Sequence, residues 1–159
     1  MSSKISADQI VVITDASCFI ILHKVDALHL LHQVFATVIT TPEIAEEYGM
    51  SLPQWVTILS VKNKTLQNDL SFIVDPGEAS AIALAHEIEN NYLITDDLQA
   101  RRLAIKLGLP MMGTLGVLLL AKQNGLINLV APYLELIKQT NFRMAPELFH
   151  TVLKEAGEI

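Results

Sequence analysis

The segment QIVVITD, residues 9–15, decides the fold class, because a β-branched apolar run stops abruptly there at Asp15. A short, continuous apolar run is typical of a strand that is buried on both faces. The pattern recurs along the chain, in TVIT (37–40), YLIT (92–95) and, more weakly, VTILSV (56–61) and LPMMG (109–113). Strands of this kind occur in parallel sheets that helices cover on both sides.

Segments with helical periodicity lie between these strands. They are SCFIILHKV (17–25), ALHLLHQVF (27–35), EIAEEYG (43–49), PGEASAIALAHEIEN (76–90), DLQARRLAIKLG (97–108) and TLGVLLLAKQNG (114–125). Two more helices are expected after Leu126, separated by NFRMAP (141–146), and the polar stretch KNKTLQND (62–69) is expected to be a mobile loop. Short strands that alternate with helices predict an α/β fold, a three-layer α/β/α sandwich around a mainly parallel sheet of about four to five short strands.

Length and charge limit the organisation and the partners. The 159 residues are 51% hydrophobic, enough for one substantial core. We therefore expect a single domain over residues 10–159, including the C-terminal helices, and a flexible N-terminal tail over residues 1–9. The net charge of −6 argues against a protein that holds nucleic acid by bulk electrostatics. A nucleic-acid substrate would need a local basic patch, a bound cation or a partner protein.

The single cysteine and the apolar runs indicate the compartment. Cys18 excludes an internal disulfide, suits a reducing cytosol, and is expected to be a small buried side chain because it lies in the run CFIIL (18–22). The first nine residues, MSSKISADQ, have no apolar segment suited to a signal peptide. The run VLLLA (117–121) is far shorter than a membrane span. We expect a cytoplasmic protein with no membrane partner.

Three acidic residues directly follow predicted strands: Asp15 follows the first, and Asp96 and Asp97 follow YLIT (92–95). The carboxyl ends of parallel strands meet at one edge of the sheet, where ligand sites lie. Asp15 suits either a helix cap or a ligand, and both interpretations stay open. In the Asp96–Asp97 pair, one residue can cap the next helix while the other points elsewhere, because one cap needs only one carboxylate.

Two glutamates belong to predicted helices. Glu47 lies one turn after Ile44, at the border of the buried stripe, whereas Glu43 and Glu46 are expected to be solvated. Glu78 lies in the first turn of its helix, where an acidic residue is favoured for electrostatic reasons alone. Taken singly, each of these glutamates suits a structural role as well as a catalytic one.

Carboxylates that converge at one edge repel one another, so the fold must either raise their pKa values or bind a cation. Oxygen ligands without a cysteine or histidine cluster favour Mg²⁺ or Mn²⁺ over zinc. The histidines form no metal-binding pair with an acidic third partner; they are His23, His29, His32, His86 and His150. The sequence therefore predicts a site for a hard divalent cation.

Together these residues resemble a known family. A strand ending at Asp15, followed by TPEIAEEY (41–48), GEASAIALA (77–85) and LITDDLQARRLA (93–104), looks like the PIN domain. The helix GTLGVLLLAKQNGLI (113–127) resembles, more narrowly, the bacterial and archaeal branch related to the VapC toxins of toxin–antitoxin pairs. The resemblance runs from Val11 to the final FRMAPELFHTVLKEAGE (142–158).

This resemblance implies a Mg²⁺- or Mn²⁺-dependent endoribonuclease, in which cation-activated water hydrolyses RNA phosphodiesters. It implies catalytic roles for Asp15, Glu47, Glu78 and Asp97, and metal ligands among Asp15, Glu78, Asp96 and Asp97. Asp97 matches the family's aspartate after the fourth strand, and Asp96 is the alternative for that role. Many members have aspartate where this chain has Glu78, whose longer side chain could shift the metal.

Two further residues have open roles beside these acids. Thr114 matches a hydroxyl that often lies beside the family's acidic cluster, and the alternative, which we favour for its main role, is an ordinary N-cap. Arg101 could contact RNA phosphate or, as we favour, form a structural ion pair with an acid of the cluster.

The resemblance also implies partners: an RNA substrate, a cognate antitoxin protein and a second copy in a homodimer. The apolar helices ALHLLHQVF (27–35) and GVLLLA (116–121) suit such a dimer, although core packing explains them equally well. The alternative function is a catalytically inactive PIN-fold module that binds RNA or protein, which would show no carboxylate-dependent Mn²⁺ binding. A dinucleotide-binding domain is disfavoured, because no strand is followed by G-x-G-x-x-G.

Overall fold

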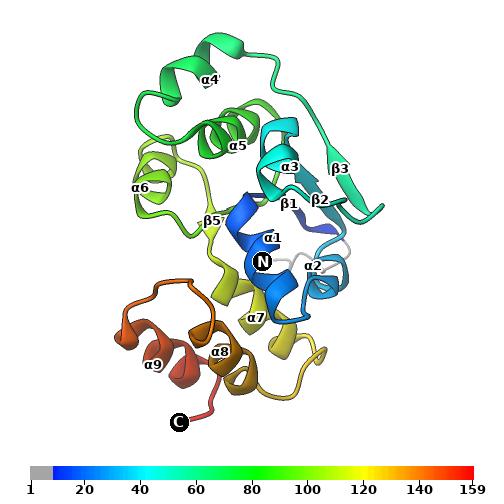
Figure 1. Cartoon of the computed structure of the whole chain (residues 1–159), viewed down its shortest axis with the longest axis vertical. Coiled ribbons are helices and arrows are strands. Elements are labelled where there is room, and N and C mark those ends of the chain that lie inside the picture. Colours follow the sequence, from blue (N-terminus) through cyan, green and yellow to red (C-terminus); the bar gives the residue numbers. More distant parts are fainter. Residues whose placement is uncertain (1–8) are drawn as a thin grey trace, which may run out of the picture.

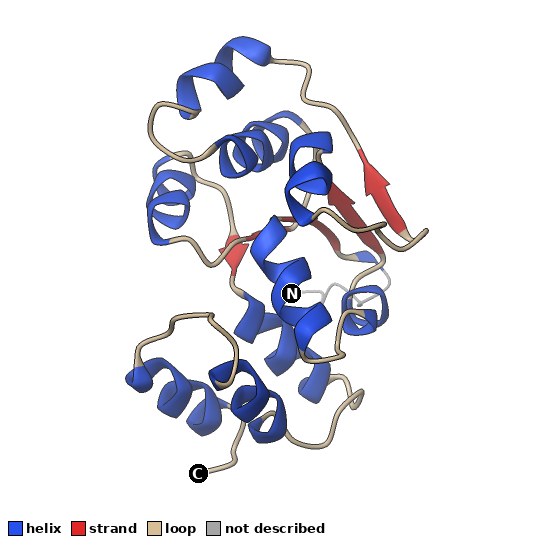
Figure 2. Ribbon diagram, viewed as in Figure 1, coloured by secondary structure: helices blue, strands red, loops and turns tan. Residues whose placement is uncertain are grey.

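The computed structural model describes residues 9–159, so the predicted tail at residues 1–9 lies outside the described residues except for Gln9. The sheet has five strands, all parallel, in the order β3-β2-β1-β4-β5 (Figure 2). Their bounds are β1 (Val11–Thr14), β2 (Thr37–Thr40), β3 (Val56–Ile58), β4 (Tyr92–Ile94) and β5 (Met111–Met112). The predicted α/β fold with a parallel central sheet is confirmed.

Helices cover both faces of this sheet. Their bounds are α1 (Ala16–Lys24), α2 (His29–Val34), α3 (Pro42–Tyr48), α4 (Lys64–Leu70), α5 (Pro76–Glu87), α6 (Leu98–Lys106), α7 (Thr114–Gln123), α8 (Ala131–Lys138) and α9 (Pro146–Glu155). Helices α4, α5 and α6 lie on one side of the sheet, and α2 and α7 lie on the other, with α8 and α9 beyond α7 (Figure 1). The predicted three layers are therefore present.

The prediction that the polar stretch 62–69 is a mobile loop is wrong, because most of this stretch belongs to helix α4. Asn63 caps the helix by accepting a hydrogen bond from the N–H of Leu66. Leu70 is buried and Leu66, one turn earlier, packs against the core, so two apolar residues at helical spacing anchor an otherwise polar segment. Those two leucines were too few to register as an apolar stripe.

The strand order places a topological switch point between β1 and β4. The chain runs from β1 outward to β2 and β3, then returns past β1 to form β4 and β5 on the other side. Beyond the end of β1, the N–H of Asp15 still donates to the carbonyl of Ile94 at 3.1 Å. Crevices for ligands form at such switch points, outside the carboxyl ends of the strands. Asp15 therefore starts the α1 helix where the fold favours a site.

The core explains the apolar helices without a partner chain. Helices α2 and α7 pack against each other, and Leu31 of α2 and Leu118 of α7 are fully buried in this single chain. Cys18 is buried and free, as predicted. None of the helices within residues 9–159 has the length and apolar composition that crossing a bilayer requires.

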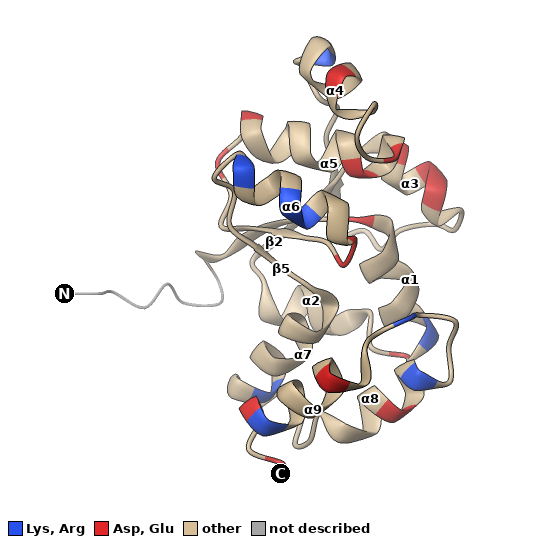
Figure 3. Ribbon diagram, turned by 90° about the vertical axis from the view of Figure 1, so that its left-hand side faces the viewer, with Lys and Arg blue, Asp and Glu red and all other residues tan. Residues whose placement is uncertain are grey.

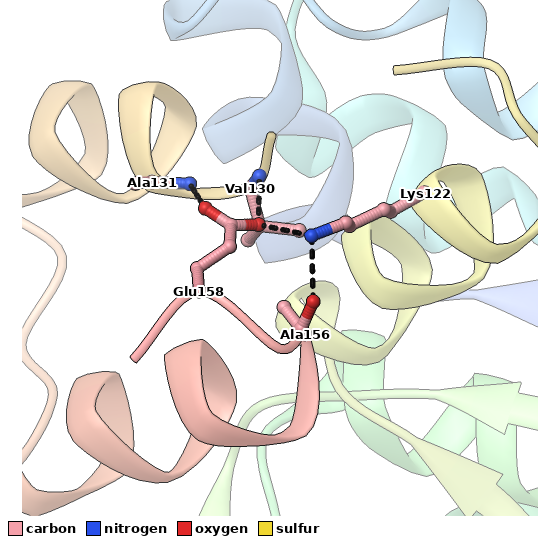
Figure 4. Close-up of polar contacts among 5 residues, drawn as sticks. All are labelled: Lys122, Val130, Ala131, Ala156 and Glu158. Carbon is pink, nitrogen blue, oxygen red and sulfur yellow. Dashed lines mark hydrogen bonds and ion pairs between the residues drawn. The ribbon is translucent and has the colours of Figure 1, made fainter. Parts of the chain in front are cut away.

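A partly buried ion pair, shown in Figure 4, fixes the C-terminus. The carboxylate of Glu158 accepts hydrogen bonds from the N–H groups of Val130 and Ala131, at 2.7 and 3.0 Å, where α8 begins. It also pairs with the ammonium of Lys122 on α7 at 2.9 Å, and that ammonium donates to the carbonyl of Ala156. This arrangement ties the end of the chain to α7 and α8.

Candidate functional site

A pocket of about 240 Å³ lies at the carboxyl edge of the sheet. Segments far apart in sequence line it, through Ala16, Ser17, Glu47, Asp75, Glu78, Asp96, Asp97 and Phe142. Figure 3 shows acidic segments of α3, of the start of α5 and of the loop before α6 close to the start of α1. We call this cavity the acid pocket. Asp15, only 1% exposed, lies behind its wall and is hydrogen-bonded to Ser17.

Asp15 caps helix α1 and also belongs to the acidic cluster. Its Oδ1 accepts from the N–H of Cys18 at 3.0 Å, and its Oδ2 accepts from the hydroxyl of Ser17 at 2.8 Å. The capping interpretation of Asp15 is therefore correct. The cap leaves the second interpretation open, because the carboxylate also contacts Glu78.

Asp15 and Glu78 form a closely coupled pair of carboxyl groups. Burial, followed by the negative charge of Asp96, raises the pKa of Asp15 to about 6. Burial, followed by the charge of Asp15, raises the pKa of Glu78 to about 9. A hydrogen bond between the two carboxyls also raises the pKa of Glu78, so the pair shares a proton at neutral pH. The hydroxyl of Thr95 donates to Glu78 Oε2 at 3.0 Å and fixes its orientation.

The two aspartates after β4 have different roles. Asp97 is exposed and caps α6, accepting from the N–H of Ala100 at 2.8 Å. Asp96 turns toward the end of β5, where it accepts from the N–H of Thr114 at 2.9 Å and from its hydroxyl at 2.6 Å. Burial raises the pKa of Asp96, against the lowering effect of these two bonds and of Arg101. The prediction that one aspartate caps and the other points elsewhere is correct.

The favoured prediction that Thr114 is an ordinary N-cap is wrong. The N-cap of α7 is Gly113, and the hydroxyl of Thr114 caps no helix. That hydroxyl instead orients Asp96. Gly113 is required by the same contact: a Cβ at this position would lie 2.7 Å from Asp96 Oδ1. The sequence GT (113–114) therefore serves to hold a carboxylate.

Glu47 reaches the acid pocket from α3 across the start of α5. A Cβ at Gly77 would overlap the Glu47 carboxylate, so glycine is what lets this side chain lie against α5. Partial burial, and then the charge of Asp75, raise the pKa of Glu47. Glu46 is exposed as predicted, whereas Glu43 is half-buried, and its Oε2 has no hydrogen-bond partner among residues 9–159.

The sequence as a whole was compared with known proteins. A family model described as DUF3368, a PIN domain, matches residues 11–158. The chain belongs to the PIN-domain family. PIN domains are in general nucleases, and they typically use divalent metal ions. The comparisons with curated proteins and with solved structures gave no match.

The donor chemistry of this PIN domain fits a hard divalent cation. The acid pocket offers carboxylate oxygens and neither cysteine nor histidine. Loss of the proton shared by Asp15 and Glu78 would leave two buried anions, whose mutual repulsion a cation offsets. Within residues 9–159 no three Asp, Glu, His or Cys side chains are already arranged as a metal site. The fit is therefore one of donor type and charge.

Three polar residues of the PIN domain's site were missed by reasoning from sequence. Asp75 lines the acid pocket and caps α5, accepting from the N–H of Glu78 at 2.9 Å. Its place before Pro76 is a typical N-cap pattern and could have revealed it. Thr95 and Ser17 orient Glu78 and Asp15, and both lie within two residues of a predicted ligand.

The favoured prediction that Arg101 forms a structural ion pair with an acid of the cluster is also wrong. Its guanidinium forms no ion pair with a carboxylate of the described PIN domain, residues 9–159. Its positive charge nevertheless lies close enough to Asp96 to lower the pKa of that residue. The half-buried guanidinium therefore stands beside the acid pocket without being neutralised by an ion pair.

Proposed function

We propose that this PIN domain is a Mg²⁺- or Mn²⁺-dependent endoribonuclease, and that it is the toxin of a toxin–antitoxin pair or a relative of one. One observation carries the nuclease proposal: carboxylates from α3, α5 and the loop before α6 line a single pocket, with Asp15 buried behind it. That pocket lies at the switch point of a parallel sheet, in a chain that belongs to a family of nucleases.

In this proposal Asp15, Glu78 and Asp96 hold the cation, with Asp97 beside them. We favour Asp96 over Asp97 as the ligand after β4, because its charge acts on Asp15, whereas Asp97 is exposed and caps α6. When bound by these carboxylates, a divalent cation would supply the means to activate water and to offset negative charge on the phosphate. Thr95 and Thr114 keep the Glu78 and Asp96 oxygens in place during the reaction.

Glu47 has a different role in the proposal. Its carboxylate lies at the mouth of the acid pocket, and its raised pKa makes it a better proton acceptor than an ordinary glutamate. We assign it the proton that the attacking water loses. Glu46, on the same helix but outside the acid pocket, provides a matched control.

The proposal extends to organisation and partners. PIN nucleases bind RNA and often antitoxins, and we propose both for this chain, acting in the cytoplasm as a single domain over residues 10–159. A homodimer remains a prediction. The burial of α2 and α7 within one chain removes the apolar helices as an argument for it.

A cleavage assay tests the function. Purified protein should degrade fluorescently labelled RNA with Mg²⁺ or Mn²⁺ and stop when chelator is added. Asp15→Asn and Glu47→Gln should lose most of this activity, and Glu46→Gln should keep it. The assignment fails if Asp15→Asn cleaves as fast as the parent. An inactive binding module would instead bind RNA without cutting it, and calorimetry would show no Mn²⁺ binding that depends on the carboxylates.

A further inference from the structure

A second cavity, of about 560 Å³, adjoins the acid pocket. Asp96 and Phe142 line both cavities, so they share a boundary at these two residues. We call this second cavity the α7–α9 groove, because α7 forms one wall and the segment 142–155 forms the other. A chain molecule lying in the groove would enter the acid pocket at its end.

The groove contains two arginines, in a protein whose net charge is −6. Arg101 and Arg143 form no ion pair with a carboxylate anywhere in residues 9–159. Of the two acids in the lining, Asp96 is held by Thr114, and Glu155 lies at the end of α9, about 13 Å along the helix axis from its start. Arg143 directly follows Phe142, and Arg101 Nη1 and Asp96 Oδ1 would lie 3.6 and 2.7 Å from the same Cβ built on Gly113. Both arginines therefore lie near the end of the groove next to the acid pocket, together with the negative charge of Asp96.

Phe142 is the aromatic side chain at the shared boundary. It is half-buried, and its N–H donates to the hydroxyl of Thr140 at 3.1 Å. The neighbouring Asn141 accepts from the ammonium of Lys24 at 2.9 Å, which ties this loop to the end of α1. These two contacts hold the loop just before Phe142, and its ring lines both cavities.

An aromatic face beside two guanidinium groups has the chemistry that binds single-stranded nucleic acid, through base stacking and phosphate contacts. The remaining wall is apolar, with Leu98, Met112 and Leu119, and suits the faces of bases. We propose that the α7–α9 groove binds the single-stranded RNA next to the bond that is cut. Arg101 and Arg143 contact its phosphates, and Phe142 stacks on a base. This inference rests on the proposed ribonuclease function of the acid pocket.

The test measures RNA affinity separately from cleavage. A fluorescein-labelled single-stranded RNA is titrated with protein in EDTA, and anisotropy gives the Kd at several salt concentrations. Phe142→Leu should weaken binding roughly 5- to 100-fold, from the loss of one stacked base. Arg143→Ala should weaken it about 10-fold and reduce the slope of log Kd against log salt by about 0.7, as expected for one phosphate contact on a single strand.

Matched variants separate these effects from loss of structure. Phe142→Trp should keep parental affinity within about two-fold, because the indole also stacks on bases. Arg102→Ala and Lys154→Ala remove exposed cations of α6 and α9 that line neither cavity, and both should bind as the parent does. Phe142→Leu and Arg143→Ala should leave Mn²⁺ binding unchanged in calorimetry.

The outcomes distinguish the groove from the nuclease. Weakened RNA binding in Phe142→Leu and Arg143→Ala supports the groove even if the parent never cuts RNA, which would sink only the proposed function. If both variants bind RNA as tightly as the parent, the proposal that the groove binds RNA is wrong, even if the parent cuts RNA normally. The apolar wall of the groove would then suit a protein partner instead. Failure of the parent chain to bind single-stranded RNA also overturns it.

Discussion

Thr114 holds Asp96 through two hydrogen bonds, from its N–H at 2.9 Å and from its hydroxyl at 2.6 Å. The hydroxyl bond fixes one oxygen of the Asp96 carboxylate in a partly buried site. Thr114→Val keeps the shape but leaves that oxygen without its donor, and should lower the free energy of unfolding by about 1–3 kcal/mol. Thr114→Ser keeps a hydroxyl donor and should therefore retain most of the parental free energy of unfolding. Urea denaturation measures both, and equal stability of the valine variant and the parent would contradict the role of the hydroxyl.

The absence of a side chain at Gly77 leaves room for the carboxylate of Glu47. Gly77→Ala places a methyl group where the Glu47 carboxylate lies, and this flexible side chain can move aside. We expect stability equal to the parent or higher by up to about 1 kcal/mol, since alanine is the better helix former. RNA cleavage should fall as far as in Glu47→Ala. In the double variant the two losses should not add, and additive losses in cleavage rate would show that Gly77 acts independently of Glu47.

The Asp15–Glu78 pair makes stability depend on pH in the absence of metal. The pKa values in the folded chain, about 6 and about 9, are higher than the ordinary 3.8 and 4.5. From about pH 4 to about pH 9 the two carboxyls therefore bind more protons in the folded chain than in the unfolded chain. The free energy of unfolding consequently falls as the pH rises through this range. Urea midpoints measured in EDTA from pH 5 to 9 should show this fall.

Two comparisons assign that fall to the pair. Glu78→Gln cannot titrate at this position, so its stability should decline less steeply over the same pH range. Saturating Mn²⁺ should stabilise the parent more at pH 8 than at pH 5, because the cation competes with protons for the carboxylates. A Glu78→Gln variant as pH-sensitive as the parent would exclude Glu78 as the cause.

The partly buried pair of Glu158 and Lys122 should stabilise the fold more than an exposed pair does. Glu158→Gln should lower the free energy of unfolding by about 1–2 kcal/mol, because the carboxylate accepts from Lys122 and from two backbone N–H groups. Glu135→Gln breaks the exposed pair with Lys138 and should change stability by less than about 0.5 kcal/mol. Urea denaturation at pH 7 measures the free energy of unfolding of both variants. Equal losses of stability in Glu158→Gln and Glu135→Gln would mean that Glu158 does not fix the C-terminus.

Reasoning from sequence located the strand ends well, and with them part of the site. Apolar runs broken by Asp15 and by Asp96–Asp97 place these carboxylates at one edge of a parallel sheet, whatever the details of packing. TVIT at residues 37–40 is a strand with the predicted bounds, and the two C-terminal helices lie on either side of NFRMAP (141–146) as expected. These features follow from local patterns of apolar and polar residues.

What the sequence did not reveal depends on contacts between distant segments. The partner of Thr114 is a carboxylate 18 positions earlier, so the local capping preference favoured the wrong role. Arg101 has acidic residues close by in sequence, yet it forms no ion pair with them. Phe142 reaches the acid pocket from a loop after α8, and no periodicity predicts such a position.

Mn²⁺-dependent cleavage by Glu78→Gln tests the central claim most directly. Without metal at pH 7 the Asp15–Glu78 pair shares a proton, so a neutral glutamine of the same shape can hydrogen-bond to Asp15 and should leave the fold intact. Rates of cleavage of a labelled single-stranded RNA are measured at saturating Mn²⁺, with EDTA as the blank. We predict that the parent cuts the RNA and that Glu78→Gln, folded by circular dichroism and urea denaturation, cuts it roughly 100-fold more slowly or not at all. Cleavage by Glu78→Gln at the parental rate would contradict the account.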